Sequence, residues 1–163
     1  MVFGVADIPD LTGRVAVVTG ANGGLGLQTA TVLAAKGAHV WLAARDERKT
    51  ARSIEAITGV APDAHLTPVP LDLGDLASVR DAAAAILSQV SRVDLLVNNA
   101  GIVATPLARN SVGQEMQLAT NYLGAFALTG TLLPFFTRTT QARIVNVGSL
   151  MHRFGKLLSL IHI

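Results

Sequence analysis

The sequence predicts a doubly wound α/β fold, in which helices cover both faces of a single parallel sheet. Short runs rich in β-branched residues alternate with helical segments along the chain, and a glycine-rich turn joins the first run to the first helix. In addition, 50% of the 163 residues are apolar while only 4% are aromatic. This composition suits Val-rich buried strands under Ala- and Leu-rich helices.

The first half of the chain is expected to form two strand–helix units and a third strand. The strands are residues 14–19, 39–44 and 65–71, and the helices are residues 25–36 and 47–57. Gly37 closes the first helix, because glycine readily adopts the left-handed conformation that follows a helix end. Pro68 and Pro70 cannot donate backbone hydrogen bonds, which places the third strand at an edge of the sheet.

The second half continues the alternation with two more helices and strands. Helices are predicted at residues 76–90 and 111–136, and strands at residues 93–98 and 143–147. Asp75 and Ser111 are expected as the N-caps of these helices, since their side chains can accept hydrogen bonds from first-turn amides. About five parallel strands result, in the order 3-2-1-4-5, and no linker divides them into domains.

Charge and composition disfavour several classes of protein. The net charge is +2, and the 13 basic and 11 acidic residues are intermixed, which argues against a nucleic-acid partner. Cysteine is absent and the four histidines are isolated, so neither a disulfide nor a metal site is expected. Residues 1–12 have no basic start and no long apolar stretch, and are interpreted as an N-terminal extension of a cytoplasmic protein.

Residues 116–137 raise the question of a membrane, because they carry no charge and are long enough to span one. Thr120, Asn121 and Pro134 would each place a polar group or a broken backbone bond in lipid, which costs several kcal/mol per unmet group. We therefore expect a helix buried against the sheet or a partner. A membrane-attached protein is the less favoured alternative.

The glycine-rich turn is the first candidate site. It contains Gly20, Asn22, Gly23, Gly24, Leu25 and Gly26, between the first strand and its helix. Free amides and the helix dipole at this position favour a pyrophosphate, and glycines let the backbone approach phosphate oxygens. Such turns also occur as packing joints, so this turn alone does not establish a nucleotide site.

Several motifs in order resemble the short-chain dehydrogenase/reductase family. The turn has the spacing Thr-Gly, three residues, Gly, one residue, Gly, and residues 98–101 match the signature Asn-Asn-Ala-Gly. Asn121 and Ser149 fall where the family places two of its four active-site residues, and residues 149–152 resemble the Ser-Leu-x-His run of retinol-dehydrogenase-like members. The resemblance implies a Rossmann-like domain that binds NAD(P) and acts on an alcohol or carbonyl substrate.

Cofactor choice is predicted from the end of the second strand. An NAD-preferring relative would carry an acidic residue at Ala44 to accept from the adenosine ribose, and Ala44 offers no acceptor. Arg45 instead presents a planar, charged fork that suits a 2′-phosphate, so NADP is expected over NAD. The alternative is that Arg45, with Arg48, Lys49 and Arg52, forms the solvated face of a helix start.

Further cofactor contacts are implied by the resemblance. Asp72 and Leu73 resemble the pair that contacts the adenine ring, although Asp72 could simply cap the following turn. The backbone of Asn99, Ala100 and Gly101 is expected near the adenosine ribose. Asn98 is interpreted as structural, because its amide can tie strands together.

Two residues are predicted for the catalytic centre. Asn121 is expected to be a buried amide that needs hydrogen-bond partners, and the resemblance implies that it bends its helix and holds a water. Ser149 follows the fifth strand, at the sheet edge where such folds bind ligands. Its hydroxyl can donate to a substrate carbonyl oxygen.

The Tyr-x-x-x-Lys pair of the family is absent from the 163 residues, since the only tyrosine, Tyr122, is followed four residues later by Phe126. The chain is therefore expected to be an inactive, C-terminally truncated fragment. Residues 13–157 would be the N-terminal portion of the dinucleotide-binding domain. Residues 158–163 can be encoded by a transposase end sequence used in sequencing libraries, which predicts an artefactual tail.

The predicted function is hydride transfer between NADP(H) and a small alcohol or carbonyl substrate, in a full-length protein that is expected to be a homo-oligomer. A non-catalytic nucleotide-binding or regulatory module is the alternative, because it would never have needed the tyrosine and lysine. An exposed fifth strand is expected to favour poor solubility or dimerisation of the fragment.

Overall fold

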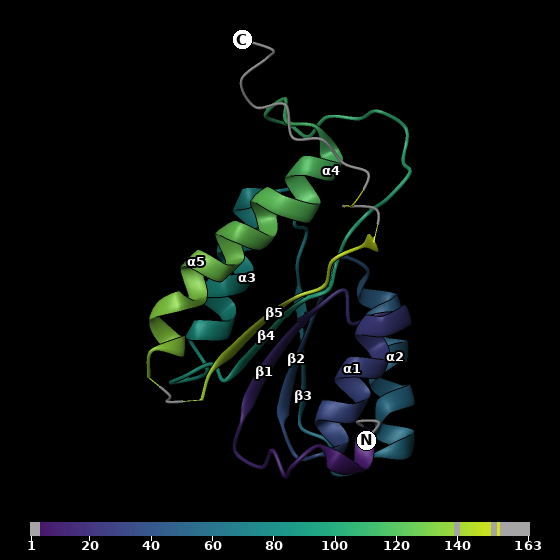
Figure 1. The fold of residues 1–163 in the computed structure, drawn as a ribbon, viewed down its shortest axis with the longest axis vertical. Helices are drawn as coiled ribbons and strands as arrows, with labels where there is room; N and C mark the ends of the chain where they lie inside the picture. The colour runs from purple at the N-terminus through teal and green to yellow at the C-terminus, as the bar shows by residue number, and fades with distance from the viewer. Residues whose placement is uncertain (1–3, 139–140, 151–152, 154–163) are drawn as a thin grey trace.

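The computed structural model describes residues 4–138, 141–150 and 153, and these residues form a five-stranded parallel sheet in the order β3-β2-β1-β4-β5. The order confirms the predicted topology (Figure 1). The predicted tail at residues 158–163, and residues 151–152 of the predicted Ser-Leu-x-His run, lie outside the described residues. The strands are β1 Val15–Thr19, β2 His39–Ala44, β3 Leu66–Pro70, β4 Leu95–Asn98 and β5 Arg143–Asn146.

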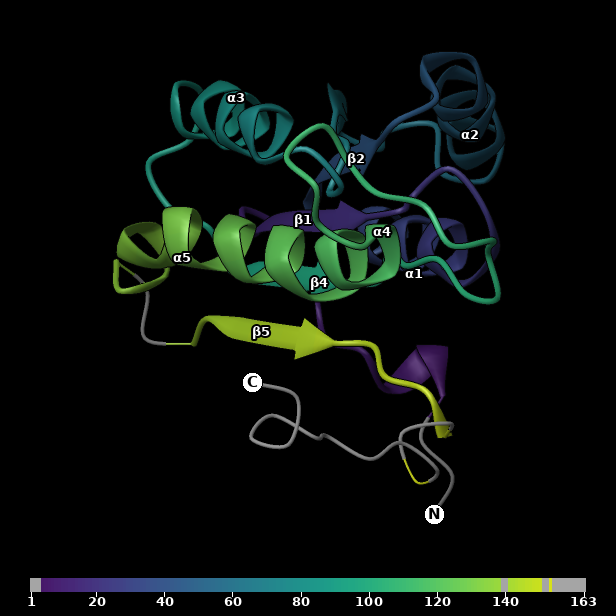
Figure 2. The ribbon, with the colours of Figure 1, turned by 90° about the horizontal axis from the view of Figure 1, so that it is seen from above.

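Helices cover both faces of this sheet, as predicted. Helices α1 (Gly24–Ala35) and α2 (Glu47–Val60) lie together on one face, and α3 (Leu76–Leu87) and α5 (Ala125–Phe136) lie together on the other (Figures 1 and 2). A short 3-10 helix, η1 (Val5–Asp7), precedes β1. Both faces of the central strands are therefore buried, which explains why β1 and β2 are apolar at nearly every position.

Each face has its own apolar core. Val17 of β1 packs with α3 and α5 residues such as Ile86 and Leu132, all essentially inaccessible to solvent. Val18, the next residue, packs with Leu33 of α1 on the opposite face. This alternation follows from the two-residue period of a strand. The core holds the carboxyl ends of the strands, and the turns that follow them, at one edge of the sheet.

The outer strand β3 contains both prolines, as predicted for an edge. It pairs only with β2, with Leu42 opposite Pro68 and Ala44 opposite Pro70. Leu71, which follows the strand, donates its amide to the Ala44 carbonyl at 3.1 Å. A strand with a neighbour on one side tolerates missing donors on the other.

The predicted helix at residues 111–136 is wrong in its start and in its regularity. Ser111 lies in a turn, where the Asn110 side chain accepts from the amides of Val112 and Gln114. The helical segment begins after Glu115, whose carboxylate accepts from the amides of residues 117 and 118 at 2.9 and 2.7 Å. These two hydrogen bonds lower the pKa of Glu115.

The segment that follows Glu115 is not one α-helix. It consists of α4 (Met116–Leu118), the π-helical segment η2 (Ala119–Gly124) and α5. Wide turns of this kind occur frequently at functional sites. In the part of the chain that the structure describes, no helix combines the length and the apolar character needed to cross a membrane.

Asp94 joins the two central strands at the end opposite the turns. Its fully buried carboxylate accepts from the Val15 amide at 2.9 Å and from the guanidinium groups of Arg14 and Arg92 at 2.8 and 3.1 Å. Burial by itself would raise the pKa of Asp94, but these donors outweigh burial and lower it. The ion pairs therefore fix β1 beside β4, and with it the relative position of the turns beyond them.

Acidification below about pH 6.5 is expected to destabilise the fold through His39. Burial, and secondly the neighbouring His65, depress the pKa of His39 below its ordinary value of 6.5, and the two rings stack with centroids 3.7 Å apart. The unfolded chain binds a proton at His39 more readily than the folded chain does. The stability that neutral His39 contributes is therefore fully present above pH 6.5 and is lost as the pH falls toward the pKa of His39 in the folded chain. Urea unfolding at pH 7.5 and 5.5 checks this.

The matched variant for that measurement is His39→Gln, which removes the titrating ring. The loss of stability between the two pH values should be smaller in this variant than in the parent chain. An equal loss in both proteins would show that the decline has another source.

Candidate functional site

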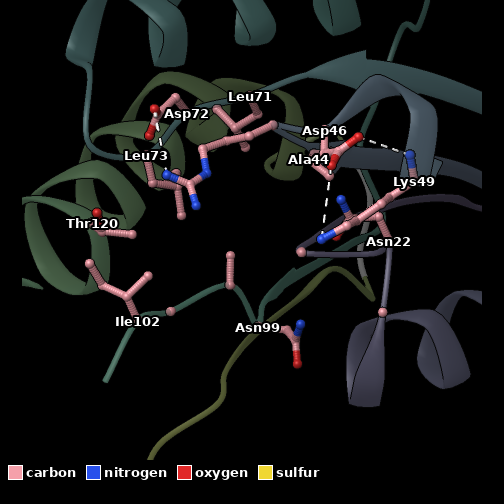
Figure 3. Close-up of a pocket in the computed structure, with 16 residues that line it drawn as sticks. Asn22, Ala44, Asp46, Lys49, Leu71, Asp72, Leu73, Asn99, Ile102 and Thr120 are labelled. Atoms are coloured by element: carbon pink, nitrogen blue, oxygen red, sulfur yellow. Dashed lines mark hydrogen bonds and ion pairs between the residues drawn. The ribbon is translucent and has the colours of Figure 1, made fainter. Parts of the chain in front are cut away.

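A cavity of about 500 Å³ opens at the carboxyl ends of the strands. Its walls come from four turns and from η2 (Figure 3). The lining residues are Gly20, Asn22 and Gly23 after β1; Ala43, Ala44, Arg45, Asp46 and Lys49 around the end of β2; Leu71, Asp72 and Leu73 after β3; Asn99, Ala100, Gly101 and Ile102 after β4; and Thr120. We refer to this cavity as the crevice.

The glycine-rich turn packs too closely for side chains at two of its glycines. Gly20 has a positive φ of 66°, and its amide donates to the Ala43 carbonyl at 2.8 Å, which fixes the turn to β2. A Cβ atom built on Gly26 would lie 2.3 Å from the Gly20 carbonyl oxygen and 2.5 Å from Nδ2 of Asn99. Helix α1 therefore reaches the turn only because residue 26 has no side chain.

The start of helix α1 differs from the starts of its neighbours. Within the described residues, α2, α3 and α4 begin at Asp46, Asp75 and Glu115, whose carboxylates accept from first-turn amides, and α1 begins at Gly23 without a side-chain cap. A Cβ at Gly23 would meet no atom within 4 Å. No side chain therefore occupies the start of α1, and uncapped helix starts of this kind can bind anions.

Thr19 fixes the turn after β4. Its hydroxyl oxygen accepts from the amides of Asn99 and Ala100 at 3.0 and 2.9 Å, and the Asn99 side chain donates to the Thr19 carbonyl at 2.9 Å. Asn98, the preceding residue, donates to Oδ1 of Asn146 at 2.8 Å and to Thr129 at 3.0 Å. Asn98 thus ties β4 to β5 and α5, which agrees with the structural interpretation made from the sequence.

The end of β2 provides the charged corner of the crevice. Ala44 is buried, and Arg45 beyond it is exposed, with Nη1 4.0 Å from Oδ2 of Asp72. Lys49 extends its ammonium to 3.9 Å from Oδ2 of Asp46 (Figure 3). Arg48 and Arg52 do not line the crevice, whereas Lys49 does. Arg45 and Lys49 thus line the crevice, although both side chains are also largely exposed to solvent.

Asp72 and Leu73, which follow β3, form the wall beside Arg45. One carboxylate oxygen of Asp72 accepts from the Gly74 amide at 2.8 Å, which is the turn-capping role considered as the alternative, while the residue also lines the crevice. Leu73 is buried, and its carbonyl oxygen would be 2.1 Å from a Cβ on Gly124. The last residue of η2 is thus pressed against this wall.

Asn121 and Ser149 line a second cavity of about 610 Å³, which shares residues 99–102 with the crevice. The Asn121 amide makes a two-way contact with the backbone of Ile102: its Oδ1 accepts from the amide and its Nδ2 donates to the carbonyl, both at 2.8 Å. The sequence analysis expected a buried amide at Asn121. That expectation is wrong, because Asn121 is exposed. The side chain lies on the open side of η2, where the turn after β4 supplies both partners.

The structure brings most predicted site residues together and leaves three aside. Gly24, Leu25 and Gly26 do not line the crevice, and the Leu25 side chain is 72% exposed. Sequence reasoning did not select Ala43, Asp46, Leu71, Ile102, Thr120 or Gly124. The residues next to strand ends could have been found from their position in the sequence. Gly124 could not, because no sequence pattern predicts a π-helical segment.

An open parallel sheet with a glycine-rich turn at its carboxyl edge is the architecture of nucleotide-binding α/β domains. The profile of the short chain dehydrogenase family matches residues 14–157. The chain therefore belongs to the short-chain dehydrogenase family, a family of oxidoreductases that bind NAD(P) and act on small molecules. The resemblance stated from the motifs is confirmed.

The similarity to individual proteins agrees with this assignment. Mouse (Mus musculus) retinol dehydrogenase 11 is 42% identical over 150 residues, which cover 90% of this chain and 46% of that protein. The Pseudomonas aeruginosa RhlG/NADP active-site complex is 33% identical with a TM-score of 0.73, covering 86% of this chain and 56% of that one.

A short chain dehydrogenase from Escherichia coli CFT073, complexed with NADPH, is 27% identical with a TM-score of 0.77, and the match covers 90% of this chain and 63% of that one. The chain spans about half the length of the curated relatives that it matches. The similarity therefore covers the strands and turns of the crevice, and only part of each relative.

Proposed function

We propose that this chain is the cofactor-binding portion of an oxidoreductase that transfers a hydride between NADP(H) and an alcohol or carbonyl substrate. The observation that carries the proposal is the crevice, whose lining includes the glycine-rich turn up to Gly23, at the uncapped start of α1, and the basic side chain of Arg45. When bound, the nicotinamide cofactor supplies or accepts the hydride. The protein's contribution is to hold and orient it.

The residues present fit such a cofactor. The open space beside Gly23, and the first-turn amides of α1, suit the pyrophosphate. Leu73 offers an apolar wall and Asp72 an acceptor for the adenine end, and the backbone of residues 99–101 is held at the crevice by Thr19. The sequence analysis assigned the same cofactor contacts to these residues, and we include them in the proposed function.

A preference for NADP over NAD is supported by what stands at the end of β2. Ala44 is buried and has no acceptor for ribose hydroxyls, and Arg45 has only one long, solvent-exposed ion pair to Asp72. Such a pair contributes about 0–1 kcal/mol, so the guanidinium is available to a stronger anion. The structures of two related proteins, from Pseudomonas aeruginosa and Escherichia coli, are complexes with NADP and NADPH.

The Arg45→Ala variant is expected to bind NADPH at least about tenfold more weakly and to bind NADH unchanged, because a charge-assisted hydrogen bond contributes about 1.5–3 kcal/mol. Fluorescence titration of the two cofactors measures both affinities. Arg48→Ala is the control, since Arg48 does not line the crevice. The preference is refuted if NADH binds the parent chain as well as NADPH and the substitution changes neither affinity.

On the substrate side, we propose that Ser149 donates to the substrate oxygen and that Asn121 acts by holding the turn at Ile102. Both line the second cavity, next to the residues shared with the crevice. The sequence contains no Tyr-x-x-x-Lys pair, so proton delivery is missing and the 163 residues by themselves are expected to turn over no substrate.

The second candidate is a nucleotide-binding module without catalysis, for which the crevice alone would be sufficient. Extending the chain to the length of its relatives separates the two proposals. Turnover of alcohols or carbonyls by a longer polypeptide that carries Tyr-x-x-x-Lys supports the enzyme. Cofactor binding without turnover by the longer polypeptide supports the module.

A further inference from the structure

Asn22, in the glycine-rich turn, differs from every other asparagine of the chain. Of the asparagines in the sequence, Asn22 alone is followed by a glycine. Among the described residues, no group is hydrogen-bonded to its side chain. The other asparagines all have side chains held by hydrogen bonds to the protein; they are Asn98, Asn99, Asn110, Asn121 and Asn146. The side-chain amide of Asn22 is therefore free to turn toward its own backbone.

The peptide nitrogen of Gly23 lies directly after this free amide. Gly23 is exposed, precedes the first turn of α1, and has an extended backbone with φ 175°. Its carbonyl accepts from the Leu27 amide at 3.1 Å, whereas no described group accepts from its own N–H. The N–H of the residue before a helix takes no part in the hydrogen bonds within that helix. A reaction at the Gly23 nitrogen therefore breaks no hydrogen bond of the fold.

The two groups can react with each other, with water as the only further reagent. The Gly23 nitrogen gives its proton to hydroxide and forms a bond to Cγ of Asn22, and the side-chain nitrogen of Asn22 leaves as ammonia. Water then opens the resulting cyclic imide. Cleavage between the nitrogen and Cγ gives aspartate, and cleavage between the nitrogen and the main-chain carbonyl carbon gives isoaspartate. Ring closure is least hindered at glycine, which has no Cβ.

Either product places a carboxylate in the crevice, because Asn22 lines it in the turn just before α1 (Figure 3). This negative charge would repel a pyrophosphate at the start of α1. Isoaspartate also lengthens the backbone by a methylene group immediately before Gly23, which displaces the start of the helix. Both products thus act against an anion at this position.

We propose that Asn22 is a site of spontaneous deamidation, and that this modification lowers the affinity of the crevice for a dinucleotide as the protein ages. The modification itself is independent of the proposed function, whereas its effect on affinity rests on that function. A cofactor whose pyrophosphate covers the turn would slow the reaction, because ring closure moves the backbone between Asn22 and Gly23.

Peptide mass spectrometry of the chain after incubation at mildly alkaline pH tests the modification. The mass gain from amide to acid, and isoaspartate, are expected at Asn22 while the other asparagines are still intact. Gly23→Ala is the matched control: the extended backbone accepts alanine, a Cβ there meets no atom within 4 Å, and conversion of Asn22 should slow severalfold. Equal conversion in the two proteins, or conversion of another asparagine before Asn22, overturns the proposal. Unfolding curves exclude misfolding of the variant.

Titration of Asn22→Asp with NADPH tests the effect on affinity. This variant carries the charge of the modified chain and should bind NADPH at least about fivefold more weakly than the parent, as expected for like charges about 4 Å apart in water. Asn22→Gln keeps a neutral amide and should lose less. Binding by Asn22→Asp as tight as by the parent overturns the effect on affinity. If Asn22 deamidates but the parent binds no NADPH, the modification stands and the proposed function fails.

Discussion

Replacing Gly26 with alanine is expected to abolish dinucleotide binding and to lower the free energy of unfolding by about 3 kcal/mol. The new Cβ would lie 2.3 Å from the Gly20 carbonyl oxygen and 2.5 Å from Nδ2 of Asn99. The carbonyl belongs to a turn that is hydrogen-bonded to β2, so it cannot yield as a flexible side chain would. Helix α1 would have to move away from the turn, and with it the amides that we propose bind the pyrophosphate.

Gly59→Ala is the matched control for this substitution. Gly59 is also helical, but a Cβ there would meet no atom within 4 Å, so the variant should bind NADPH like the parent and be at least as stable. Chemical unfolding and NADPH titration measure both properties. Normal binding and stability in Gly26→Ala would mean that the close packing of α1 on the turn is not required.

Gly124→Ala is expected to have a comparable effect on the other side of the crevice. A Cβ on Gly124 would be 2.1 Å from the Leu73 carbonyl oxygen, so η2 and the wall formed by Leu73 cannot both keep their places. We expect a loss of about 3 kcal/mol in the free energy of unfolding, together with weaker binding of the adenosine end of the cofactor. Thermal or urea unfolding and titration with adenosine monophosphate check the two effects.

The same helical segment offers a control of opposite sign. Gly130 lies in α5, is exposed, and has open space where a Cβ would be added. Gly130→Ala should raise the free energy of unfolding by about 0.5–1 kcal/mol, the ordinary gain for alanine over glycine in a helix. If Gly124→Ala stabilised the chain as Gly130→Ala does, the proposed contact between η2 and the crevice wall would be contradicted.

The sheet could be predicted because its signals are local and agree with one another. Buried parallel strands are continuous apolar runs, and the β2 prediction at residues 39–44 matches the structure at both ends. The edge position of β3 followed from Pro68 and Pro70, since proline limits where a strand can sit. Strand order followed from the doubly wound arrangement that the alternation of strands and helices predicts, not from any single residue.

The helix after the fourth strand shows where such reasoning fails. Ser111 is a good N-cap by residue type, but Asn110 forms a competing turn and Glu115 caps the helix instead. The π-helical segment ends at Gly124, which packs closely on Leu73, and that contact joins residues far apart in the sequence. The start of the helix was thus decided by local side-chain hydrogen bonds that residue preferences do not rank, and the packing of Gly124 on Leu73 is a tertiary contact that they do not contain.

Some residues of the candidate site could likewise be predicted from the sequence, and others could not. Turn residues such as Gly20 and Asn99 could be selected because a parallel sheet brings its turns to one edge. Lys49 could not be separated from Arg48 in the sequence, since the difference between them is the direction of a side chain on α2. The hydrogen bonds from Asn121 to Ile102 also required coordinates, because they join η2 to a turn 19 residues earlier.

The most direct measurement is the crystal structure of this chain soaked with NADPH. We predict density for the cofactor along the crevice, with its pyrophosphate at the start of α1 and its 2′-phosphate against Arg45. A crevice without cofactor density, or a cofactor bound elsewhere on the molecule, would contradict the proposal that this edge of the sheet binds NADP(H).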